Sequence, residues 1–198
     1  QDADITVNGK EYLDEALAKK RGVILVTGHF GVWEIMLAWF GLNRYSMLAV
    51  GQKQKNSGAD IFVNQLRENA WIKMIPRKSS LEFMYEALAS NRILTLASDQ
   101  DAKKRGIFVK FFSLPASTPK GAARFHLECG SPLIFVTCHL EKPNNHVLDI
   151  LPVPADSNSN IETITQSFTL MLEKIITDYP EQYFWFHRRW KTKPPQTE

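Results

Sequence analysis

The sequence predicts an α/β fold, a single domain whose central, mostly parallel sheet carries helices on both faces. Short continuous runs of Val, Ile and Leu alternate with segments of helical periodicity along the chain. Strands that are apolar at every position are typical of parallel sheets, because helices cover both faces of such a sheet. The 198 residues suffice for one well-formed core, and no linker, repeat or low-complexity tract divides them. We therefore expect one domain over residues 1–198.

Four apolar runs predict the strands of the first half of the chain. These runs are residues 23–26, 46–50, 72–75 and 93–97. Apolar residues at helical spacing precede the first run, at residues 11–20, and Arg21-Gly22 ends that helix. Helical patterns at 59–69 and 79–90 separate the later runs, so helix and strand alternate.

The second half continues the alternation. Residues 107–112 predict a strand and residues 119–128 a helix. Residues 133–140 and 147–153 predict two strands that pair across a turn at Pro143-Asn144-Asn145. Residues 161–176 place their apolar side chains on one stripe and predict a long amphipathic helix. Residues 183–190 predict a short aromatic strand.

Charge and cysteine usage narrow the class of protein. The excess of basic over acidic residues is 24 − 21 = +3, which suits an anionic partner without requiring one. Two basic clusters, at 103–105 and 188–193, suit phosphate, although a solvated face explains them as well. No nucleic-acid motif accompanies them, so we expect no nucleic-acid partner. Cys129 and Cys138 lack metal-ligand spacing and are expected to be reduced core residues of a cytosol-facing protein.

The longest apolar stretch, residues 35–42, is far shorter than the roughly 20 residues of a membrane-spanning helix. This stretch is therefore not expected to cross a bilayer. The sequence begins at Gln1, with no signal-peptide core before its first helix, and we expect a preceding segment to have been removed.

Polar side chains follow the first and fourth predicted strands. Residues 28–34, GHFGVWE, come after the first, and residues 98–101, SDQD, come after the fourth. Ligands of open α/β sheets bind at the carboxyl ends of the strands, so these side chains are expected to converge.

His29 and Glu34 are the candidates for acid–base chemistry. Five residues apart on one straight helix, they would point about 140° from each other. If His29 instead lies in the strand-to-helix turn and Glu34 in the first helical turn, carboxylate and imidazole can touch. A carboxylate on one ring nitrogen fixes the tautomer and prepares the other nitrogen to accept a hydroxyl proton. A His–Glu pair at this spacing is, however, more often structural than catalytic.

Other enzyme classes lack their motifs. The remaining histidines show no paired metal-binding spacing, so we expect no metal site. There is no Gly-x-Ser-x-Gly for a serine hydrolase. Neither a phosphate-loop lysine motif nor a Gly-x-Gly-x-x-Gly after the first strand indicates nucleotide binding.

Several sequence blocks together resemble the late acyltransferases of lipid A biosynthesis, within the wider glycerolipid acyltransferase superfamily. In chain order the blocks are GHFGVWE (28–34), Asn64 to Arg67, DQD (99–101), FFSLPA (111–116) and WFHRRWK (185–191). They span nearly the whole chain. Val32 stands where the family pattern is expected to have Asn, and Ser113 where it is expected to have Gly. These departures leave the choice of substrate open.

The resemblance implies an O-acyltransferase. A fatty acyl chain would pass from a thioester, on acyl carrier protein or on coenzyme A, to a hydroxyl of a lipid A precursor or related glycolipid. The family works at the cytoplasmic face of the bacterial inner membrane, has an N-terminal membrane anchor before the region seen here, and needs no cofactor. Residues 1–198 would then be its catalytic domain, with the membrane surface and a lipid acceptor as partners.

The resemblance also assigns roles to single residues. His29 would be the base and Glu34 its partner, while Arg67 and Asp99 would bind substrate. A guanidinium suits phosphate by charge and geometry, which favours a phosphate of the donor arm or the precursor for Arg67. Arg188 and Arg189 would meet lipid phosphates. The structural alternatives are a surface charge for Arg67, a helix N-cap for Asp99 and an exposed basic tail for the two C-terminal arginines.

Two other functions remain open at this point. One is the same chemistry on a glycerophospholipid or an amino-acid lipid. The other is a non-catalytic module that binds anionic lipids, which the intact pair of His29 and Glu34 disfavours.

Overall fold

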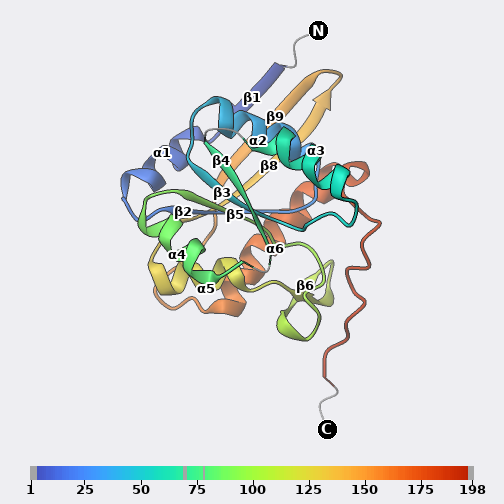
Figure 1. The fold of residues 1–198 in the computed structure, drawn as a ribbon. Coiled ribbons are helices and arrows are strands. Elements are labelled where there is room, and N and C mark those ends of the chain that lie inside the picture. The colour runs from blue at the N-terminus through green and yellow to red at the C-terminus, as the bar shows by residue number, and fades with distance from the viewer. Residues whose placement is uncertain (1–3, 69–70, 78, 196–198) are drawn as a thin grey trace.

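The computed structural model describes residues 4–68, 71–77 and 79–195, which form one α/β domain (Figure 1). Seven strands make the central sheet in the order β1-β9-β8-β2-β5-β3-β4. Its strands are β1 (Asp4–Asn8), β2 (Val23–Thr27), β3 (Met47–Gly51), β4 (Ile72–Pro76), β5 (Ile93–Ala97), β8 (Leu133–Lys142) and β9 (Asn145–Pro152). The helices are α1 (Lys10–Ala18), α2 (Trp33–Leu42), α3 (Ser57–Arg67), α4 (Leu81–Ala89), α5 (Gly121–Cys129) and α6 (Ile161–Asp178).

The sheet is mostly parallel, as predicted. Neighbours from β8 through β2, β5 and β3 to β4 pair in parallel, while β8 and β9 form an antiparallel hairpin. The turn of this hairpin lies at Pro143-Asn144, within the predicted position. Strand β1 adds to β9 in parallel at the sheet edge. The predicted α/β class is therefore confirmed.

The apolar strands are buried on both faces because they feed two separate cores. In β2, Ile24 and Val26 pack toward α4, α5 and α6, while Val23 and Leu25 pack toward α1 and α2. Figure 1 shows α1, α2 and α3 on one side of the sheet and α4, α5 and α6 on the other. Alternate residues of one strand thus point into different cores, which explains the unbroken apolar runs.

Two elements escaped the sequence analysis. Strand β1 alternates exposed and half-buried residues, which is a weak signal for an edge strand. Strand β7 (Leu114–Thr118) pairs with β6 (Ile107–Phe111) in a separate two-stranded antiparallel sheet. The predicted helix at 59–69 ends at Arg67; Asn69, like Gln1, lies outside the described residues.

The strand predicted at 183–190 is wrong. Tyr183 makes a single bridge to Phe30, after which the chain turns, with the Trp185 amide donating to the Tyr183 carbonyl. Residues 184–190 form no strand, so the alternation of aromatic side chains in the sequence does not reflect a pleated strand. Short 3₁₀ turns occur at Lys103–Arg105 and Pro180–Gln182.

Candidate active site

His29 and Asp99 lie at the carboxyl ends of adjacent parallel strands. Strands β2 and β5 pair with Thr27 opposite Ala97, so both chains leave the sheet at the same edge. The Ser98 amide then donates to the Thr27 carbonyl at 2.9 Å, which extends the pairing one residue further. This register brings together two residues that are 70 positions apart in sequence.

Asp99 holds His29 through two hydrogen bonds. The His29 backbone N–H donates to Oδ2 at 3.0 Å, and Nδ1 of the imidazole lies 2.8 Å from Oδ1. The Asp99 carboxylate is 4% exposed, whereas the His29 side chain keeps 29% of its surface exposed. An ionised carboxylate only accepts, so Nδ1 carries the proton and Nε2 is left with a free lone pair. The arrangement is that of a general base with an orienting carboxylate.

The same contact tunes the basicity of His29. Burial is the largest influence and opposes the imidazolium, but the hydrogen bond and the negative charge of Asp99 together outweigh it. The pKa of His29 is therefore raised above the 6.5 of a free imidazole. A base whose pKa is raised takes up a proton more readily.

Glu34 does not hold His29, which differs from the expected pairing. Its carboxylate accepts from Arg67 Nε at 3.1 and 3.0 Å, also bonds Arg67 Nη2, and accepts from Trp33 Nε1 at 3.1 Å. No hydrogen bond joins Glu34 to His29 among the residues that the structure describes. Glu34 lies in the first turn of α2, from which its side chain reaches toward the end of α3. Arg67 thus pairs with the carboxylate that was expected to bond the imidazole.

The path of the backbone between His29 and Glu34 depends on Gly31. This residue has a φ of +60°, and a Cβ atom there would lie 2.0 Å from the Cys138 carbonyl oxygen. The adjacent Val32 amide donates to that same oxygen at 2.7 Å. Only glycine fits so close to strand β8 at this φ, and the resulting turn starts α2 two residues later, at Trp33.

Aromatic side chains surround the imidazole. The rings of Trp33 and Phe184 have centroids 5.5 and 6.2 Å from that of His29. Phe184 is held there because its amide donates to the His29 carbonyl at 3.0 Å. Tyr183, which is 6% exposed, lies inside the protein near Asp99. Burial and the Asp99 carboxylate raise the pKa of its phenol. Tyr183 and Phe184 were expected in a strand, and their place at the site was not predicted.

A pocket adjoins Arg67 on the inner side of α3. It has a volume of about 190 Å³ and lies at the carboxyl ends of β3 and β4. The polar side chains of its lining are Gln52, Lys53, Gln54, Asp60, Asn64 and Arg67. The cationic side chains of Lys53 and Arg67, together with the side-chain amides, can receive an anionic or strongly polar group.

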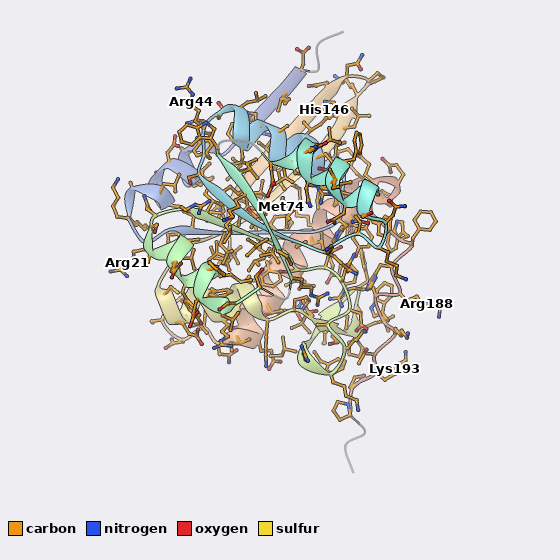
Figure 2. All side chains as sticks on the ribbon, viewed as in Figure 1. Arg21, Arg44, Met74, His146, Arg188 and Lys193 are labelled. Carbon is orange, nitrogen blue, oxygen red and sulfur yellow. The ribbon has the colours of Figure 1, made fainter. Side chains whose placement is uncertain are left out.

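Arg188 and Arg189 occupy opposite environments. Arg188 is exposed and extends outward from the C-terminal segment, as Figure 2 shows. Arg189 is 2% exposed, donates to the Ser117 carbonyl at 2.7 Å and to the Thr118 hydroxyl, and stacks over Phe111 at 5.3 Å. Its guanidinium is thus engaged inside the protein, which differs from the expected contact with lipid phosphate. Burial lowers the pKa of Arg189, although the nearby Asp99 and Asp101 oppose this.

The described ranges hold no group of three or more His, Cys, Asp or Glu side chains placed to bind a metal ion. Within the same ranges, no helix is both long enough and apolar enough to cross a bilayer.

Comparison with known proteins identifies the family of the chain. The family model for bacterial lipid A biosynthesis acyltransferases matches residues 2–192. The chain belongs to this family. It is 30% identical over 196 residues to the lipid A biosynthesis lauroyltransferase of Escherichia coli K12, covering 95% of the chain and 62% of that protein. It is 24% identical over 191 residues to the phosphatidylinositol mannoside acyltransferase of Mycobacterium tuberculosis H37Rv, covering 94% and 60%.

The chain spans 60 to 62% of the length of those two relatives.

One expected departure from the family pattern has a clear structural setting. Ser113 lies in the turn between β6 and β7 with a φ of 64°, next to Phe112 at 49°. Both values fall in the left-handed region that favours glycine, which explains why a Gly is expected there.

Proposed function

We propose that this chain is the catalytic part of an O-acyltransferase that moves a fatty acyl group from a thioester to a hydroxyl of a lipid A precursor or related glycolipid. The observation that carries the proposal is the partly exposed imidazole of His29, with a buried carboxylate on its Nδ1, at the carboxyl edge of the sheet. Membership of the lipid A acyltransferase family supports the reaction class.

The geometry supports direct transfer. Nε2 of His29 takes the proton of the acceptor hydroxyl as its oxygen attacks the thioester carbon. The imidazolium that forms is stabilised by the Asp99 carboxylate, 2.8 Å from Nδ1. When the tetrahedral intermediate collapses, the C–S bond breaks and the imidazolium returns the proton to the departing thiolate. The ester and the free thiol are the products.

Glu34 and Arg67 serve this reaction as a positioning pair. The Glu34 carboxylate fixes the Arg67 guanidinium at the rim of the 190 Å³ pocket, beside Lys53. We assign this pocket to a phosphate group, either of the donor's prosthetic arm or of the acceptor. The donor is a thioester of acyl carrier protein or of coenzyme A, and the enzyme acts at the cytoplasmic face of the bacterial inner membrane. The exposed Arg188 is available to lipid phosphate.

The relatives name two kinds of acceptor. One acts in lipid A biosynthesis and another on phosphatidylinositol mannoside, at 30% and 24% identity. A glycolipid acceptor is common to both names. We rank the lipid A precursor first because identity to the lauroyltransferase is higher, and a phosphatidylinositol mannoside is the second candidate.

The proposed function predicts a detectable ester product. The chain is incubated with isotope-labelled acyl carrier protein thioester or acyl-CoA and, in separate reactions, with a lipid A precursor or a phosphatidylinositol mannoside in detergent. Mass spectrometry should find the labelled acyl group on a hydroxyl of one acceptor. Hydrolysis to free fatty acid alone, with every acceptor left unmodified, would contradict acyl transfer.

Direct transfer further predicts that neither cysteine is needed. Burial, followed by the charge of Asp149, raises the pKa of Cys138 to about 12, and burial followed by Glu128 raises the pKa of Cys129. Neither thiol is then activated as a nucleophile. A Cys129→Ala, Cys138→Ala variant should keep turnover within about threefold of the parent, and intact-mass spectra during turnover should show no acylated protein. A stable acyl adduct on the parent that the variant lacks would require a covalent mechanism.

A further inference from the structure

Helix α3 has its polarity inverted relative to the rest of the fold. The face that it turns toward the protein carries Asp60, Asn64 and Arg67 beside the apolar Val63, all half-buried. The opposite face carries Ile61, Phe62 and Leu66, whose side chains are 58, 61 and 70% exposed. No residue of α3 is fully buried. A surface helix normally places its apolar stripe on the core, so this arrangement needs a second apolar environment outside the described domain.

Contacts at its C-terminal end hold the helix in this rotation. Arg67 is fixed by Glu34 of α2, and Glu68, directly after the helix, accepts from the Met74 amide of β4 at 3.0 Å. The bonds of Asn56 to the Ala59 amide and of Asp60 to the Gln54 amide order the start of the helix and the loop before it. Turning α3 to bury its apolar side chains would break the contacts with α2 and β4 and leave Glu34 without its cation. The outward apolar face is therefore built into the structure.

A second exposed apolar group lies next to His29. Phe184, Trp185 and Phe186 are 40, 49 and 91% exposed, and the rings of Phe184 and Phe186 lie 5.6 Å apart. Phe184 contacts the His29 ring, while α3 is joined to the same site through Arg67, Glu34 and Trp33. Both apolar groups are thus connected to the site around His29.

Basic side chains accompany both groups. Lys53 and Lys55 are exposed in the loop before α3, and Arg188 is exposed two residues after Phe186. Large apolar side chains next to Lys and Arg fit the boundary between acyl chains and anionic headgroups, and Trp is typical of that boundary. The combination of exposed apolar and basic side chains therefore favours a lipid surface as the partner.

We propose that the outer face of α3 (Ile61, Phe62, Leu66) and the segment Phe184–Phe186 form one docking surface for an anionic lipid bilayer, with α3 lying in the membrane interface. This inference rests on the proposed function in one respect, that the acceptor is a membrane lipid. Docking in this orientation turns the exposed edge of His29 toward the headgroups. A lipid acceptor then reaches the base by lateral diffusion without leaving the bilayer.

The test compares two matched triple variants of the whole chain. The first is Ile61→Gln, Phe62→Gln, Leu66→Gln on α3; Gln is a good helix former and all three positions are exposed. The control is Leu81→Gln, Leu127→Gln, Leu170→Gln on α4, α5 and α6, where the side chains are 45, 46 and 53% exposed. Sedimentation with vesicles of phosphatidylglycerol and phosphatidylethanolamine measures binding. The α3 variant should bind at least about tenfold more weakly than the parent, and the control should bind like the parent.

Two further measurements separate this proposal from the function itself. Raising the salt concentration, or replacing anionic vesicles by phosphatidylcholine, should weaken binding of the parent because Lys53, Lys55 and Arg188 contribute through charge. Turnover on a detergent-dispersed acceptor should be equal in parent and α3 variant. The proposal would be overturned if the α3 variant bound anionic vesicles as tightly as the parent does. It would also be overturned if the variant lost only the binding of acyl carrier protein. If the parent shows no turnover, the vesicle measurements still decide the docking surface.

Discussion

Replacing His29 by Asn is expected to lower kcat by about 10³-fold, within the range that a positioned general base contributes. The Asn amide can still donate a hydrogen bond to Asp99, which now accepts from His29 Nδ1 at 2.8 Å. It has no lone pair basic enough to take a hydroxyl proton. The variant therefore removes the base while the buried carboxylate keeps a partner, which a change to Ala would not achieve.

The comparison needs a folded variant and an imidazole control. His126, on α5, bonds the Ser131 carbonyl through Nδ1 at 2.8 Å and lies in a different part of the fold. His126→Ala should cost some thermal stability and leave turnover near that of the parent. Melting temperatures by circular dichroism, alongside initial rates from the mass-spectrometric assay, make the comparison. A His29→Asn protein with parental melting and parental rates would exclude His29 as the base.

Replacing Asp99 by Asn is expected to lower kcat by about 10³-fold and also to change the pH profile. The neutral imidazole is the active form, so the rate rises with pH through the pKa of His29. Asp99 is what raises that pKa, and burial opposes it. Without the carboxylate, burial dominates and the pKa falls. The acid limb of the profile should move to lower pH, although the plateau is lower.

Glu34→Gln is the matched control for that experiment, because it removes the other nearby carboxylate. Glu34 bonds Arg67 and Trp33 and makes no described hydrogen bond to His29. Its loss frees the Arg67 guanidinium and should lower turnover by about tenfold through poorer positioning, with the acid limb close to that of the parent. A large displacement of the limb in Glu34→Gln, with none in Asp99→Asn, would restore the His29–Glu34 pairing expected from sequence.

Much of the fold followed from local patterns because those patterns have a direct physical cause. Strand β2 is apolar at four successive positions, since alternate side chains enter the two cores of the domain. The stripe on α6 that includes Ile164, Phe168 and Leu172 is buried as its periodicity predicts. Residues 183–190 show the limit of such patterns. Their alternating aromatics resemble a strand, yet the backbone makes one bridge at Tyr183 and then turns.

The site could be predicted only in part from the sequence. Strand exits are detectable, so His29 and Asp99 were correctly expected to converge. The partner of the imidazole was chosen by closeness in sequence, which favoured Glu34. The register of β2 on β5 instead brings Asp99 within hydrogen-bond distance. The burial of Arg189 was not predicted for a similar reason. A run of basic residues does not show which of its side chains points into the protein.

By itself, the sequence determined the fold class, the strand exits and the family motif around His29. These depend on the spacing of residue types along a few turns or one strand, which local geometry converts directly into structure. The tertiary structure alone decided that Asp99 bonds Nδ1 of the imidazole, that Glu34 pairs with Arg67 and that α3 turns its apolar side outward. The physical reason is that each of these depends on contacts between elements far apart in sequence, and packing sets such contacts.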